Sequence, residues 1–128
     1  MTSKDQDQSF SFADALRCAA KGIALASKER NFRIDIVFAL VTIALGFICS
    51  ISTTEWLIVI VCFGLVLGGE TFNSALEALV DLVSPDYHVL AGKAKDCAAG
   101  AVLLFALASF VIGCIIFIPK LLTLIFGV

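Results

Sequence analysis

Charged residues and prolines are scarce in this chain. Asp, Glu, Lys and Arg together make up 16% of its 128 residues, and it contains two prolines. Soluble globular proteins carry about a quarter charged residues. This shortage, with 60% apolar residues and a mean hydropathy of +1.03, excludes an ordinary soluble domain. The composition and length predict one membrane domain, residues 1–128.

Motifs for redox chemistry, nucleic-acid binding and glycine-loop nucleotide binding are also missing. The five cysteines stand singly without a CxxC pair, so we expect them to behave as small apolar residues. No basic tract suggests a nucleic-acid partner, and neither GxGxxG nor GxxxxGK[ST] occurs. A nucleotide would therefore have to be held between helices.

Long apolar segments are the most prominent feature that the sequence does contain. Three of them reach or approach the ~20 residues that cross a hydrocarbon core, at 34–51, 56–82 and 93–119. The link at 83–92 contains Pro85, which cannot continue the helix before it. These segments predict an all-α membrane protein with three transmembrane helices.

Residues 9–28 alternate apolar and polar positions at a helical period, which predicts an amphipathic helix at the membrane interface. This helix can be a simple anchor or a part of the active site. Lys and Arg precede the first span and follow the second, so the N-terminus and the link 83–92 are expected in the cytoplasm. Lys120 is the one basic residue on the side that this rule places outside the cytoplasm. Because the chain starts without a basic region and an apolar core, we expect its N-terminus to be retained.

The stretch GGETFNSALEALVD places polar residues along the far end of the second span. Glu70, Asn73, Glu77 and Asp81 follow one another at intervals of three or four residues and therefore share one helix face. At ~1.5 Å per residue from Trp56, Glu70 lies roughly 21 Å into a core of about 30 Å. Since ionised carboxylates are costly in lipid, this stripe predicts a functional site.

The stripe suits a reaction between a lipid hydroxyl and a water-soluble cosubstrate. A carboxylate in apolar surroundings binds a proton more readily, so Glu70 is the candidate general base. A carboxylate at the aqueous end suits Mg²⁺, and Glu77 is the candidate, with Glu29 an acid at the same boundary. Phosphoryl transfer also needs positive charge on the phosphates. Lys95 and Lys93 can supply it.

Other interpretations fit some of these residues. A buried Glu can carry protons in a small proton-coupled exporter, although an exporter does not require acids and a lysine at the boundary. In a purely structural subunit, Asn73 and the acids would pair helices. His88, the only histidine, is as readily a solvated loop residue as a nucleotide contact. We expect Asp81 to pair with a basic neighbour.

The segment GETFNSALEALVDLVSPDYHVLAGKAKDCAAGAVLL resembles the signature of the small bacterial integral-membrane lipid kinases, the diacylglycerol kinase and undecaprenol kinase family. The shared pattern is Glu-x-x-Asn-[Ser/Thr]-Ala-x-Glu-x-x-x-Asp, followed by Tyr-His and Ala-Lys-Asp. The resemblance extends to ERNFRID and IIFIPKLL and covers nearly the whole chain from about Phe12. Segments such as STTEWL and AKDCAAGAVLL look closer to the undecaprenol kinases.

The resemblance implies ATP- and Mg²⁺-dependent phosphorylation of a membrane lipid alcohol at the cytoplasmic face of the bacterial cytoplasmic membrane. Undecaprenol is the favoured acceptor and diacylglycerol the alternative. The resemblance also implies a homotrimer with active sites shared between subunits. It implies that Glu70 accepts the proton, with Asn73 nearby, and that Glu29 and Glu77 bind the metal that accompanies ATP. The residues implied to contact the nucleotide are Asp86, Tyr87, His88, Lys95 and Asp96.

Overall fold

Four helices make up the fold. The computed structural model describes residues 11–127, and the position of residue 9, the expected start of the surface helix, lies outside them. The helices are α1 (Phe12–Ala26), α2 (Arg30–Ile48), α3 (Thr53–Val83) and α4 (Val89–Phe126). The expected all-helical class is confirmed, and α2, α3 and α4 are each long and apolar enough to cross a membrane.

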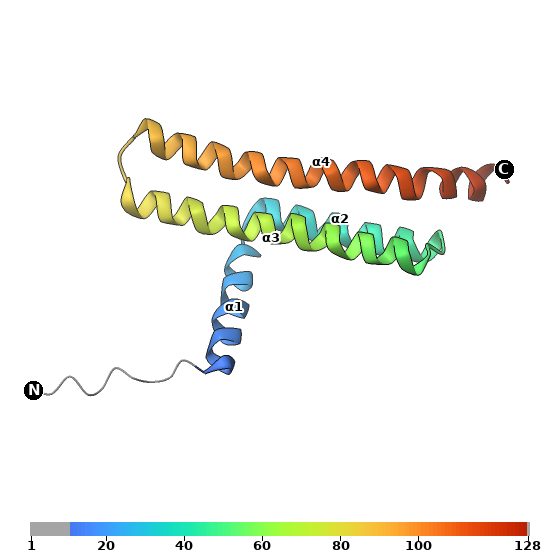
Figure 1. Cartoon of the computed structure of the whole chain (residues 1–128), viewed down its shortest axis with the longest axis horizontal. Coiled ribbons are helices and arrows are strands. Elements are labelled where there is room, and N and C mark those ends of the chain that lie inside the picture. Colours follow the sequence, from blue (N-terminus) through green and yellow to red (C-terminus); the bar gives the residue numbers. More distant parts are fainter. Residues whose placement is uncertain (1–10, 128) are drawn as a thin grey trace, which may run out of the picture.

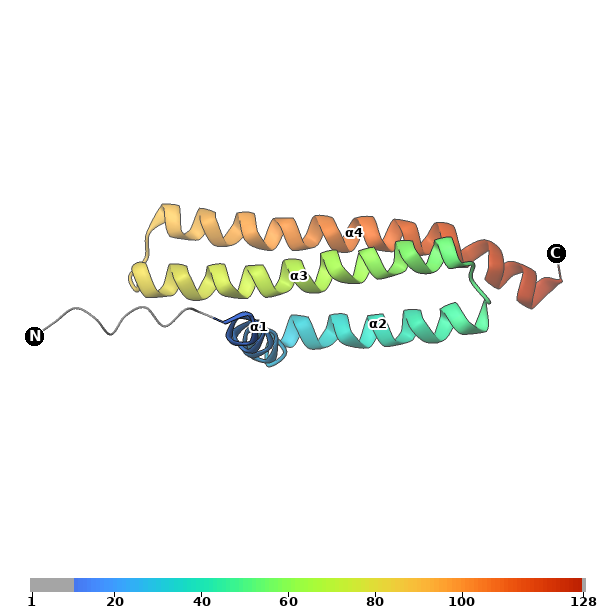
Figure 2. The same ribbon diagram turned by 60° about the horizontal axis from the view of Figure 1, so that its bottom comes forward.

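The three long helices run side by side, whereas α1 extends away from the bundle, transverse to their direction (Figure 1). Figure 2 shows α3 next to both α2 and α4, with the red C-terminal part of α4 bending away from the bundle. Pro119 lies inside α4. A proline inside a helix removes one backbone hydrogen bond and bends the helix there.

Local sequence signals explain where the helices begin. Ser52 caps α3, since its hydroxyl accepts a hydrogen bond from the Glu55 N–H, while Glu55 accepts one from the Ser52 N–H at 2.6 Å. His88 caps α4, because its Nδ1 accepts a hydrogen bond from the Leu90 N–H at 3.2 Å. Between them, α3 ends two residues before Pro85, as expected from the restricted backbone that precedes a proline.

Close packing between α3 and α4 depends on Gly69. A Cβ atom added there would lie 2.8 Å from Cδ2 of Phe105, so the two helices approach closely beside Glu70. At the far end of the bundle, Lys120 Nζ of α4 lies 3.2 Å from Glu55 Oε2 of α3. Lys120, the basic residue on the expected outer side, is therefore paired with an acid.

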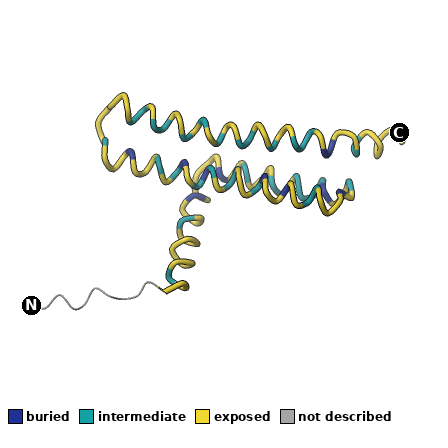
Figure 3. The backbone as a smooth tube through the Cα atoms, in the orientation of Figure 1, coloured by how far each residue is buried: buried dark blue, intermediate teal, exposed yellow. Residues whose placement is uncertain are grey.

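Most side chains are exposed in the single chain, as the yellow of the tube in Figure 3 shows. A small apolar cluster, Ile51, Val59, Ile116 and Phe117, joins α3 and α4 near the α2–α3 turn. Two polar residues are buried among residues 11–127, and both lie on α3: Glu70, 3% exposed, and Asn73, 8% exposed. The fold thus encloses the polar pair that the sequence places inside the membrane.

Candidate active site

Glu70 and Asn73 are buried because α3 lies between α2 and α4. The hydroxyl groups nearby are satisfied locally: Ser74 Oγ donates to the Glu70 carbonyl at 3.0 Å, and Thr71 Oγ1 donates to the Leu67 carbonyl at 2.8 Å. Such bonds back to the preceding turn are usual for hydroxyl side chains inside helices. The carboxyl group of Glu70 and the amide of Asn73 are therefore the polar groups at this level that are available for chemistry.

The amide of Asn73 orients Glu77. Its Nδ2 donates a hydrogen bond to Glu77 Oε1 at 3.1 Å, one helical turn further along α3. Its Oδ1 is buried and, within residues 11–127, has no hydrogen-bond partner. Leaving such an acceptor unpaired costs about 1–3 kcal/mol. Asn73 therefore presents an oxygen that a donor or a cation can use, next to a carboxylate of fixed orientation.

The start of α2 brings further polar groups to Glu70. Glu29, Asp35 and Glu77 all lie close enough to act electrostatically on the Glu70 carboxyl, and the Asn31 amide faces it. Glu29 is the N-cap residue of α2, but its side chain accepts no hydrogen bond from the first turn. The Glu29 carboxylate is thus not used for capping.

Asp35 and Asn31 are not among the residues that the sequence pattern predicts for the site. Asp35 did carry a signal, because it is an ionisable residue inside an apolar span, as Glu70 is. It lines a groove of about 590 Å³ between α2, α3 and α4. Asn31 lies before the apolar segment, and nothing in its spacing distinguishes it from an ordinary surface residue.

The acids fit a magnesium ion only in part. Over the described range, no three side chains of His, Cys, Asp or Glu gather closely enough to hold a metal by themselves. Mg²⁺ usually takes one or two carboxylates and fills its remaining positions with water and phosphate oxygens. Glu77, with the open Asn73 oxygen beside it, and Glu29 therefore suit an ion that arrives with a nucleotide.

A lysine side chain, Lys95, lies at the end of the bundle next to the link. Lys95 Nζ of α4 contacts Asp81 Oδ1 of α3 at 2.5 Å, so Asp81 pairs with a basic neighbour as expected. Asp86, Tyr87 and Asp96 are exposed at the same end. Within residues 11–127, no side-chain hydrogen bond or ion pair joins these three to the Glu70 group.

Two open grooves flank α3 on different faces. Val59, Cys62 and Val66 line the groove between α2 and α4, and Glu70 and Asn73 continue this series at intervals of three or four residues. The groove therefore lies on the face of α3 that carries the buried carboxyl group, and Val66, one helical turn before Glu70, is among its lining residues.

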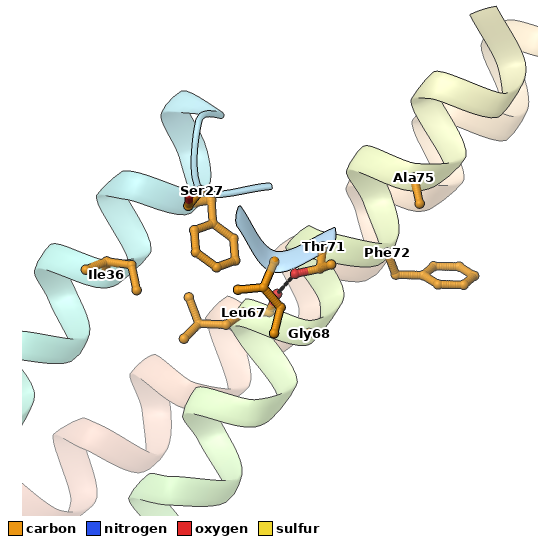
Figure 4. Close-up of a pocket in the computed structure, with 9 residues that line it drawn as sticks. Ser27, Ile36, Leu67, Gly68, Thr71, Phe72 and Ala75 are labelled. Carbon is orange, nitrogen blue, oxygen red and sulfur yellow. Dashed lines mark hydrogen bonds between the residues drawn. The ribbon is translucent and has the colours of Figure 1, made fainter. Parts of the chain in front are cut away.

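The second groove, about 710 Å³, lies between α1, α2 and α3 (Figure 4). Its α3 side chains include Thr71, Phe72 and Ala75, while Leu67 borders both grooves. At about 100° per residue, Thr71, Phe72 and Ala75 face away from Glu70 and Asn73. Of the two grooves, the one between α2 and α4 is thus on the side of the carboxyl group.

Three apolar helices that enclose a carboxyl–amide pair, with further acids and a lysine towards one end, define a multi-pass membrane protein with an enzyme-like polar site. Comparison with known proteins gives its class. The family model described as prokaryotic diacylglycerol kinase matches residues 17–117. The chain belongs to the prokaryotic diacylglycerol kinase family and is a membrane lipid kinase.

Individual relatives carry two names. The chain is 40% identical over 123 residues to the undecaprenol kinase of Bacillus subtilis (strain 168). This alignment covers 94% of this chain and 100% of that protein. It is 38% identical over 112 residues to the diacylglycerol kinase of Synechocystis sp., and that alignment covers 86% of this chain and 64% of the relative. The diacylglycerol kinase of Escherichia coli (strain K12) is 32% identical over 97 residues, and that alignment covers 75% of this chain and 80% of the relative. The expected resemblance and enzyme class are confirmed, and the kinase class decides against the exporter.

Proposed function

We propose that this lipid kinase transfers the γ-phosphate of ATP to undecaprenol, giving undecaprenyl phosphate and ADP. The observation that carries this choice is the match to the undecaprenol kinase of Bacillus subtilis, which extends over 94% of this chain and the whole of that protein. The diacylglycerol kinase of Synechocystis sp. is matched over 64% of its length. Diacylglycerol is the alternative acceptor.

In the proposed reaction Glu70 is the general base. It takes the proton of the lipid hydroxyl while the hydroxyl oxygen attacks the γ-phosphorus, and the bond to the bridging oxygen of ADP breaks. Its burial, with 3% of its surface exposed, supports this role because water is excluded from the carboxyl group. The groove between α2 and α4 lies on the same face of α3 and supports a path for an apolar chain towards this residue.

Glu29 and Glu77 are proposed to hold Mg²⁺, with Asn73 keeping Glu77 in orientation. A bound magnesium ion would neutralise charge on the β- and γ-phosphate oxygens. The hydrogen bond from Asn73 Nδ2 to Glu77 supports this assignment, since it fixes one carboxylate oxygen and leaves the other for a ligand. The residues proposed to contact the nucleotide are Asp86, Tyr87, His88, Lys95 and Asp96.

The same proposal includes a homotrimer with shared active sites, in the bacterial cytoplasmic membrane with the N-terminus and the site on the cytoplasmic side. The large exposed apolar surface of α2–α4 is available to lipid and to other subunits. The direction of α1, which extends away from the bundle and transverse to the long helices, supports a helix lying at the membrane surface (Figure 1). Phe12 and Leu16 are exposed on it and would contact the lipid.

The experiment that tests the acceptor is a side-by-side assay. Purified protein in lipid vesicles receives labelled ATP and Mg²⁺ with undecaprenol or diacylglycerol at equal surface concentration. We expect a higher kcat/KM with undecaprenol. A higher value with diacylglycerol would replace undecaprenol as the acceptor, and label in neither lipid would refute the proposed reaction.

A further inference from the structure

The ion pair between Asp81 and Lys95 is a direct polar link between the end of α3 and the beginning of α4. Asp81 is in the last turns of α3, and Lys95 is in the second turn of α4, on the other side of the link. The two side chains come from positions 14 residues apart, so the helix crossing creates this contact and the helical period of either segment does not.

Stability is a weak explanation for this pair. The Asp81 side chain is 66% exposed and the Lys95 side chain 37% exposed. Ion pairs so open to solvent contribute little to folding, because screening weakens them and ordering two long side chains costs entropy. The Glu55–Lys120 pair joins the same two helices at the other end and is less exposed, at 24% and 31%.

The pair also stands next to the polar stripe of α3. Asn73 donates to Glu77, and Asp81 lies one turn beyond Glu77 on the same face. Lys95 is close enough to Glu77 for the two charges to interact. Asp81 therefore holds an ammonium group beside the carboxylate that we assign to the metal.

We propose that Asp81 is a positioning residue that holds the Lys95 ammonium group where nucleotide phosphates bind. This inference rests on the proposed function, because it takes Lys95 as a phosphate contact. A lysine carries three N–H donors on a flexible stem. Asp81 accepts one of them and limits the positions of the stem, which leaves the other two for phosphate oxygens. Asp81 itself does not touch the phosphates, since two anions repel.

The test compares Asp81→Asn with Glu55→Gln. Each variant removes one carboxylate from an α3–α4 ion pair, but the second does so far from the site. Steady-state kinetics with the lipid acceptor saturating gives kcat and the KM for MgATP. We expect Asp81→Asn to raise that KM about five- to tenfold with kcat changed less than twofold, while Glu55→Gln leaves both unchanged. Asp81→Glu should recover part of the loss.

Two further measurements separate positioning from other roles. In a Lys95→Ala background, Asp81→Asn should have no further effect on the KM, because its partner is gone. Calorimetric binding of MgATP without lipid should weaken by the same factor as the KM rises, whichever lipid is the acceptor. An unchanged or lower KM in Asp81→Asn would overturn the proposal. Failure of the proposed function would appear separately, as absent phosphorylation by the unaltered protein.

Discussion

A methyl group added at Gly69 tests the packing that buries Glu70. The new Cβ of Gly69→Ala would lie 2.8 Å from Cδ2 and 3.2 Å from Cε2 of Phe105, so the ring or the α3–α4 spacing must shift. Overpacking of this kind costs typically about 1–3 kcal/mol. The neighbouring Gly68 is a matched control, because a Cβ there meets no described atom within 4 Å.

Both alanine variants gain the same helix propensity, about 1 kcal/mol relative to glycine, so their difference isolates the contact with Phe105. We expect Gly68→Ala to be more stable than Gly69→Ala by about 1–3 kcal/mol. The assay is unfolding in mixed micelles with increasing SDS, followed by circular dichroism. In a Phe105→Ala background the difference should fall by about 1 kcal/mol or more. Equal stability of the two variants, or a difference unaffected by Phe105→Ala, would refute the close α3–α4 packing.

Three further outcomes follow from the site. Asn73→Asp removes the hydrogen-bond donor to Glu77 and puts a second carboxylate against it. We expect kcat/KM to fall about 10–100-fold and activity to require a higher Mg²⁺ concentration, which a metal titration of activity measures. Chelation with EDTA should stop turnover, and added Mg²⁺ should restore it; activity that persists without divalent metal would exclude the assigned metal role. Lys120→Met breaks the Glu55 pair at the far end of the bundle, so the free energy of unfolding should change by no more than about 1 kcal/mol and the KM for MgATP should stay the same.

Hydropathy and helical spacing predict that Glu70 and Asn73 share one face inside an apolar span, and the structure buries both. Both lie in an apolar segment at a regular interval, and a polar residue there faces protein because lipid offers it no hydrogen bonds. The bond from Asn73 to Glu77 follows from the same spacing, since residues four apart are neighbours on a helix.

Contacts between helices could not be predicted in this way. The approach of Asp35 and Asn31 to Glu70 depends on how α2 crosses α3, and no periodicity within either helix encodes that crossing. Asp81 was expected to meet some basic residue, but its partner Lys95 is fixed by the turn between α3 and α4. The role of Gly69 likewise depends on a residue of another helix, Phe105.

The helix α4 is longer at both ends than the apolar segment that predicts it. Hydropathy placed the third span at 93–119, whereas the helix itself runs from Val89 to Phe126. His88 caps its start, a role that depends on backbone conformation. Pro119 does not end it, because a proline inside a long helix can bend it without stopping it.

The most direct test of the account is turnover by Glu70→Gln. Glutamine keeps the shape of the side chain but cannot accept the proton, and general-base catalysis contributes about 10²–10⁴-fold to rate. With undecaprenol and MgATP, the account predicts a loss of kcat in that range, while calorimetric MgATP binding and the SDS unfolding midpoint stay close to those of the unaltered protein. Full turnover by Glu70→Gln would contradict the assignment of the buried carboxyl group as the base.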